Sequence, residues 1–147
     1  MTTTSATAHR DLDFARLLTL VERSLVLRLA EALKADGATI EEWRVLALLG
    51  DGNGHAMTEI AEFVMLPAPS LTKVVDRMVS ANLVHRRVDD ADRRRVLAFA
   101  TDRGRQELQQ WNATVEREYD EVVTAVGREE TALLKALLTR VSGQLSG

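Results

Sequence analysis

The sequence predicts a mainly α-helical fold with one small β-hairpin, and three observations support this prediction. Apolar residues recur at three- and four-residue steps along most of the 147 residues, which is the spacing of amphipathic helices. This period gives way to short β-branched segments between residues 84 and 101. The chain has two prolines and no cysteine, so few residues interrupt helices and neither a disulfide framework nor a thiolate metal site can form.

The first predicted helix runs from Asp11 to about Ala35. Its apolar positions keep helical spacing and are Phe14, Leu17, Leu18, Val21, Leu25, Leu29 and Leu33. The eight residues at the start of the chain are small and polar, and they are expected to form a frayed tail. A second helix follows Gly37 and runs to about Gly50, and Thr39 and Glu42 have the spacing of a capping box at its start.

Two short helices joined by a tight break are predicted next. Thr58 is the expected cap of the first, and the sequence MLPAP ends it. The second runs from about Ala68 to Ala81 and has a narrow apolar stripe. Its other side is small and basic, with Thr72, Lys73, Asp76, Arg77 and Ser80. This is the pattern of a helix-turn-helix, whose second helix enters the major groove of DNA.

A β-hairpin with a strongly charged tip is predicted after these helices. Its strands are Val84–Val88 and Arg95–Thr101, and the sequence RRVDDADRRRV (86–96) covers the tip. From Ala68 to Arg105 there are nine Lys or Arg against five Asp, a net +4, which leaves −7 for the rest of a chain whose net charge is −3. Arginines so placed can pair with phosphates, and a narrow hairpin can enter the minor groove.

Asp92 stands beside these arginines, and we interpret it as a residue that orients one of them. A carboxylate two residues from Arg94 could hold its guanidinium in one direction by a bidentate pair. The alternative is a solvated loop whose charges neutralise each other. Because Lys73 and Arg77 lie on the neighbouring helix, we favour DNA contact.

Two further helices are predicted after Asp102. The first keeps helical apolar spacing up to Gly127, which is its expected stop, and the second begins near Glu129 and Glu130. The helices at both ends of the chain carry more apolar surface than one small lobe can cover, so we expect a partner copy to cover it. No second domain is expected within residues 1–147.

The segment from Met57 to Arg105 resembles the winged helix-turn-helix of the MarR family of bacterial transcriptional regulators. The most specific match is DDADRRRVLAFATDRG, in which Asp92, Arg93, Arg94, Thr101 and Gly104 stand at positions of the family's wing signature. The chain departs from the family at Pro67 and Pro69, near the start of the second helix, so base preference is not carried over there. Ala100 also replaces the usual Leu before Thr101.

The resemblance implies a homodimeric, ligand-responsive repressor that binds a roughly palindromic operator in double-stranded DNA. In it residues 39–101 would form a winged lobe, and residues 9–36 and 102–145 would form dimerisation helices. The predicted DNA-binding residues lie on the second helix of the lobe and on the wing: Ser70, Thr72, Lys73, Arg77, Arg86, Asp92, Arg93, Arg94 and Arg95. Many members release DNA when a small phenolic or anionic aromatic compound binds, and Arg16, Trp43 and Arg86 are the residues we expect to line its pocket.

Other functions are weighed against this one. The acidic residues at the hairpin tip lack the glycine and distal Glu of a calcium loop, so neither a metal nor another cofactor is expected. The histidines are far apart and no nucleophile stands beside them, so an enzyme is not expected. Trp43 and Trp111 lie on apolar helix faces, where a core or dimer contact is the default interpretation and a pocket wall is the alternative. A helical dimer that binds protein partners through the same lobe is the alternative function.

The chain is expected to be cytoplasmic, without a membrane partner. No apolar run reaches the roughly 18 residues that a membrane span requires. The start, MTTTSATAHR, lacks the apolar centre of a secretory signal.

Overall fold

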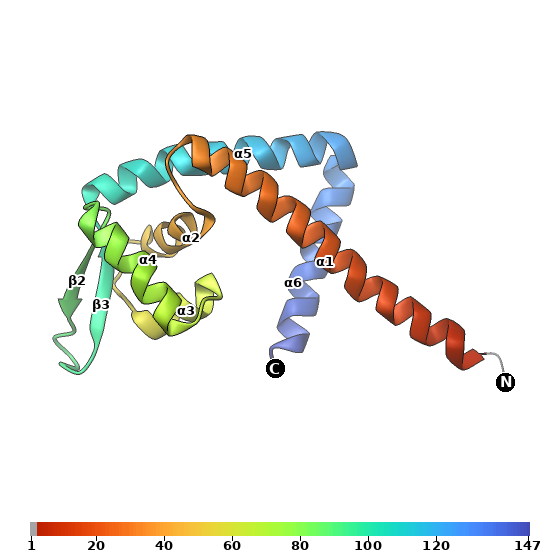
Figure 1. The fold of residues 1–147 in the computed structure, drawn as a ribbon, viewed down its shortest axis with the longest axis horizontal. Coiled ribbons are helices and arrows are strands. Elements are labelled where there is room, and N and C mark those ends of the chain that lie inside the picture. The colour runs from red at the N-terminus through yellow and green to blue at the C-terminus, as the bar shows by residue number, and fades with distance from the viewer. Residues whose placement is uncertain (1–2) are drawn as a thin grey trace.

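The computed structural model describes residues 3–147, with side chains from residue 13 onward. In this part of the chain the elements follow in the order α1 (Thr3–Ala35), α2 (Ile40–Leu49), β1 (His55–Ala56), α3 (Met57–Val64), α4 (Ala68–Ser80), β2 (Val84–Val88), β3 (Val96–Ala100), α5 (Asp102–Val126) and α6 (Arg128–Leu145). The mainly helical fold with a small hairpin is therefore confirmed. Figure 1 shows a lobe made of α2, α3, α4 and the strands beneath one end of α5, while α1 and α6 extend away from it.

The beginning of α1 differs from the prediction. The helix begins at Thr3, so the expected tail is wrong for the residues from Thr3 onward, while Met1 and Thr2 lie outside the described residues. The physical reason is that neither Gly nor Pro stands between Thr3 and Asp11, so no residue with a strong penalty ends the helix there.

The caps of the lobe helices are partly as predicted. The backbone N–H of Glu42 donates to Thr39 Oγ1 at 3.2 Å, which confirms Thr39 as the N-cap of α2. Thr39 Oγ1 in turn donates to Glu42 Oε1 at 3.1 Å, in place of the predicted bond from the backbone of Thr39. Thr58 is not the cap of α3, because the pairing of β1 with β3 brings the chain into the helix earlier, at Met57.

Three strands form one antiparallel sheet in the order β1-β3-β2. The predicted hairpin is confirmed, with Val84 opposite Ala100 and Val88 opposite Val96. Strand β1, in which His55 pairs with Ala98, was not predicted, because two residues are too few to show a strand period. β1 ties the segment before α3 to the hairpin.

The hydrophobic core lies inside the lobe and continues beneath α5. Leu46, Ile60, Val75 and Met78 are fully buried there. Trp111 of α5 is 2% exposed and belongs to the same core, so the core interpretation of this residue is confirmed. Burial of each large apolar side chain contributes about 1.5–3 kcal/mol, which fixes the lobe against α5. No helix in the described part of the chain has an apolar stretch that could span a bilayer.

Candidate DNA-binding interface

The turn between α3 and α4 brings the two helices into a helix-turn-helix. Met65 ends α3 in the left-handed conformation, with φ 60° and ψ 43°. The N–H of Leu66 donates to the carbonyl of Ala61 at 3.0 Å, which satisfies a free carbonyl at the helix end. Pro67 then serves as the N-cap of α4. The tight break predicted from the prolines is confirmed.

The outer face of α4 presents all four of the residues predicted there. Ser70, Thr72, Lys73 and Arg77 are exposed. Thr72 donates its hydroxyl hydrogen to the carbonyl of Ala68 at 2.9 Å, which leaves its oxygen free to accept a bond from outside. This face can therefore offer cations, hydroxyl acceptors and the free backbone N–H groups of the first helical turn to a nucleic acid.

The hairpin tip, residues 89–95, is shaped by its own aspartates. Asp89 Oδ1 accepts the backbone N–H of Ala91 at 3.0 Å, and Asp92 Oδ1 accepts that of Arg94 at 3.1 Å. The backbone of Arg95 closes the loop by donating to the carbonyl of Asp92 at 2.9 Å. Both carboxylates therefore hold turns in the backbone, which is a common role of Asp in tight loops.

The predicted pair between Asp92 and the guanidinium of Arg94 is not found. Among the described residues no ion pair joins these two side chains. Asp92 Oδ1 is held by the backbone N–H of Arg94 instead, because an Asx turn brings that N–H within reach at two residues' separation. Asp92 orients the backbone that carries Arg94, and it does not orient the guanidinium directly.

The arginines near the hairpin fall into two groups. Arg86 Nη2 lies 2.7 Å from Asp76 Oδ1 of α4, and Arg95 Nη2 lies 3.2 Å from Glu59 Oε1 of α3. Arg93 and Arg94 are exposed, and within the described residues their guanidinium groups have no ion pair. Exposed pairs contribute only about 0–1 kcal/mol, so phosphates can compete for Arg86 and Arg95, but Arg93 and Arg94 need lose no partner.

Two features of this surface were missed by the sequence analysis. The acid partners Asp76 and Glu59 were not recognised, although an acid on an otherwise basic face of α4 was a usable signal. Arg87 was not selected either, and its guanidinium carbon lies 4.4 Å from the centroid of the Phe99 ring on the next strand. This cation–π contact restrains a further cation on the hairpin.

Thr101 joins the hairpin, the end of α4 and the start of α5. Its hydroxyl donates to the carbonyl of Asn82 at 2.6 Å and accepts the N–H of Gly104 at 2.9 Å as the N-cap of α5. Gly104 lies so close to this joint that a Cβ there would come within 2.1 Å of the carbonyl oxygen of Leu83. The contacts of Thr101 therefore set the hairpin relative to α4.

Replacing Thr101 by Val is expected to lower the free energy of unfolding by about 1–2 kcal/mol, because the shape is retained while the cap and the bond to Asn82 are both lost. Urea denaturation monitored by circular dichroism measures this effect. Thr124→Val is the matched control, since the hydroxyl of Thr124 donates only within its own helix, to Asp120. Equal stability of the two variants would contradict the joint role of Thr101.

The residues predicted to line an effector pocket are not brought together. Arg16 is exposed on α1, Trp43 Nε1 donates to Asn112 Oδ1 at 2.9 Å, and Arg86 is bound to Asp76. The bond of Trp43 to α5 and that of Arg86 to α4 draw the two side chains to different elements. None of the three lines the apolar cavity between α1, α5 and α6.

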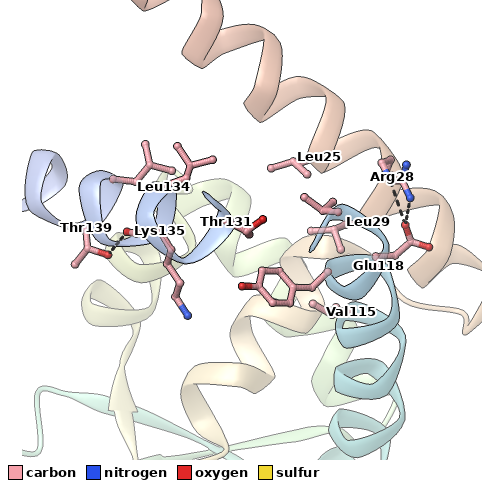
Figure 2. A pocket seen from close by; sticks show the side chains of 12 residues that line it. Leu25, Arg28, Leu29, Val115, Glu118, Thr131, Leu134, Lys135 and Thr139 are labelled. Carbon is pink, nitrogen blue, oxygen red and sulfur yellow. Dashed lines mark hydrogen bonds and ion pairs between the residues drawn. The ribbon is translucent and has the colours of Figure 1, made fainter. Parts of the chain in front are cut away.

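That cavity, of about 330 Å³, lies between α1, α5 and α6 (Figure 2). Leu25, Leu29, Val115 and Leu134 supply apolar walls. At its edge Arg28 Nη2 lies 3.1 Å from Glu118 Oε2, which links α1 to α5. The cavity opens on the surfaces where these helices leave the lobe.

Large apolar side chains remain exposed on the same helices. On α1 and α6 they are Phe14, Leu17, Leu18, Leu20, Val21, Leu25, Leu27, Leu133, Leu134, Leu137, Leu138, Val141 and Leu145. Exposed apolar surface of this extent is typical of an interface with another protein chain. It lies apart from the exposed face of α4 and the hairpin tip (Figure 1).

Comparison with known proteins is consistent with this geometry. A model of the MarR family matches residues 38–96, the segment that holds the helix-turn-helix and most of the hairpin. Over this segment the chain is similar to the MarR family. The HTH-type transcriptional regulator FarR of Neisseria gonorrhoeae is 29% identical to it over 119 residues, which cover 81% of this chain and 82% of FarR.

Solved structures of the family superpose over most of the chain. A variant of MarR from Escherichia coli complexed with operator DNA has a TM-score of 0.79 and 25% identity, and covers 90% of this chain and 95% of its own. NadR in complex with 4-hydroxyphenylacetate has a TM-score of 0.73 and 28% identity, and the match covers 84% of this chain and 88% of the NadR chain. Over most of its length the chain is therefore similar to DNA-binding transcriptional regulators of the MarR family. The hairpin β2–β3 is its wing.

Proposed function

We propose that the chain is a homodimeric repressor that binds a roughly palindromic operator and releases it when a small aromatic acid binds. The observation that carries the proposal is the separation of two surfaces on one molecule. The apolar faces of α1 and α6 lie at one end, and the exposed face of α4 and the guanidinium groups of Arg93 and Arg94 lie at the other. A two-fold axis through the apolar faces would leave both DNA-binding surfaces free.

In this proposal each residue has a defined part in binding. The side chains of Thr72, Lys73 and Arg77 approach bases or phosphates in the major groove, with Ser70 more peripheral. The wing places Arg93 and Arg94 at the minor groove, while Arg86 and Arg95 exchange their carboxylates for phosphates or stay as supports. Asp92 acts through the backbone of the tip.

The dimer and the operator are tested together. Light scattering after size exclusion should give twice the 16.3 kDa of the chain. Duplexes selected from genomic fragments should carry two half-sites about one helical turn apart, and their binding should weaken steeply with salt. A monomer, or equal affinity for every duplex, would contradict the proposal; capture of proteins without DNA binding would favour the protein-interaction alternative.

The release by an effector is proposed from the resemblance to a family with a ligand-bound member, NadR. We expect 4-hydroxyphenylacetate or a related aromatic acid to raise the melting temperature of the free protein, because a ligand that binds the folded state stabilises it. We also expect it to weaken DNA binding, because a ligand that prefers one of two dimer geometries shifts the population toward that geometry. The uncharged 4-hydroxyphenylacetamide is the matched control. Stabilisation without DNA release would show that the compound binds but is no effector.

A further inference from the structure

A partly buried histidine stands between two carboxylates at the base of the wing. His55 Nε2 lies 2.7 Å from Asp51 Oδ2, and His55 Nδ1 lies 3.2 Å from Glu59 Oε2. The His55 side chain is 15% exposed, whereas those of Asp51 and Glu59 are 41% and 52% exposed. Glu59 reaches further, to Arg95 of the wing tip at 3.2 Å. The four side chains form one chain of alternating charge, the His55 cluster.

The His55 cluster is attached to the wing at three points. His55 itself belongs to β1 and pairs with Ala98 of β3. Glu59 holds Arg95 through their ion pair. The loop that begins at Asp51 ends at Gly54, where an added Cβ would come within 2.3 Å of the Phe99 ring of β3. A change in the charge of the His55 ring would therefore act on β3 and on the wing tip, which carries Arg95.

The geometry suits a protonated imidazole. A neutral ring carries one N–H, so one of the two carboxylates would then face a nitrogen lone pair. Burial lowers the pKa of His55, but the hydrogen bonds and charges of Asp51 and Glu59 outweigh it and raise the pKa above its ordinary value. The hydrogen bond from His55 is the first cause that lowers the pKa of Glu59. Of the elements packed on the ring, α3 and the loop before β1 supply these two carboxylates, and β3 supplies backbone.

We propose that protonated His55 holds the wing in its DNA-binding position, and that loss of this proton as the pH rises loosens the wing and weakens DNA binding. The proposal rests on the proposed DNA-binding function. The sign follows from linkage: a group whose pKa is raised by folding stabilises the structure below its unfolded pKa, and this contribution is lost as the pH rises through the folded value. Neutralising the ring leaves Asp51 and Glu59 with Arg95 as the remaining cation of the cluster.

The first test uses the protein without DNA. Hydrogen exchange of the β2–β3 amides, corrected for the intrinsic pH dependence of exchange, is compared at about pH 6, below the ordinary pKa of histidine, and at about pH 8.5, above the range in which histidine titrates. Wild-type protein should lose protection in the wing at the higher pH, while His55→Gln should have the same, lower protection at both. His85→Gln is the matched control, since His85 stacks on Phe99 in the same sheet but has no carboxylate partner among the described residues.

The second test measures DNA affinity over the same pH range with a selected duplex at constant salt. Wild-type and His85→Gln proteins should bind about fivefold more weakly at the higher pH, and His55→Gln should show a flat profile. Asp51→Asn should move the midpoint of the loss of DNA affinity to lower pH, because Asp51 helps to raise the pKa of His55. This variant keeps the test decisive if His55→Gln does not fold. The proposal would be overturned if the wild-type wing kept the same hydrogen-exchange protection at both pH values, or if His55→Gln showed the same pH dependence as the wild type. If the protection of the wing changed with pH as expected but the protein bound no DNA, the proposed function would be wrong instead.

Discussion

Replacing Arg94 by Ala is expected to weaken operator binding by about 1–3 kcal/mol and to reduce the slope of log affinity against log salt by about one. The guanidinium of Arg94 is exposed at the wing tip, and among the described residues it has no ion pair. Its backbone N–H is held by Asp92, so the tip is shaped before DNA arrives and little order has to be gained on binding. Fluorescence anisotropy at several salt concentrations measures both quantities.

Arg140→Ala is the matched control for this prediction, because Arg140 is also exposed but lies on α6, away from the wing. It should keep wild-type affinity and slope. Arg95→Ala should have a smaller effect than Arg94→Ala, since Arg95 is already paired with Glu59. If Arg94→Ala bound the operator as the wild type does, the wing would not contact DNA.

Replacing Leu137 by Glu is expected to reduce operator affinity by about 100-fold or more, because it should place a charge in the dimer interface and leave single winged lobes. Leu137 is 48% exposed in the isolated chain and belongs to the apolar face of α6. The variant should therefore fold normally as a monomer, which circular dichroism and light scattering can establish. Its binding to DNA should no longer depend on the presence of a second half-site.

Ala136→Glu is the matched control on the same helix. Residues one apart on a helix point about 100° apart, and Ala136 lies on the side opposite the leucine face. This variant should remain dimeric and bind the operator as the wild type does. A dimeric Leu137→Glu protein with full affinity would exclude the α6 face from the interface.

The winged helix-turn-helix could be predicted because its signals are local. The apolar stripe of α4, the proline-rich break before it and the alternation in the hairpin each come from the period or the stereochemistry of a short segment. The N-cap Thr39 is local in the same sense. The predicted start of α1 and the predicted cap of α3 were wrong. The start depends on the absence of a stop signal, and the cap depends on a strand pairing with residues more than forty positions away.

The candidate site was predictable as a set of residues but not as a set of contacts. Sequence alone placed the basic residues on the outer face of α4 and on the wing, since their number and spacing decide that. The pairings of Arg86 with Asp76 and of Arg95 with Glu59 join different elements, and the latter spans 36 residues. Periodicity carries no information about such distances, so the division of the arginines into paired and free groups could not be foreseen.

The amino-acid sequence by itself determined the order of the elements, the charge of the winged lobe and the family to which the chain is similar, because each of these depends on neighbours along the chain. The tertiary structure decided which arginines of the wing have an ion pair among the described residues, where the apolar cavity lies, and that His55 meets two carboxylates beneath the wing. The physical reason is that hydrogen bonds and ion pairs act over a few ångströms in space. Only the packing of α3, α4 and the loop before β1 against the sheet brings the partners of these arginines and of His55 within that range.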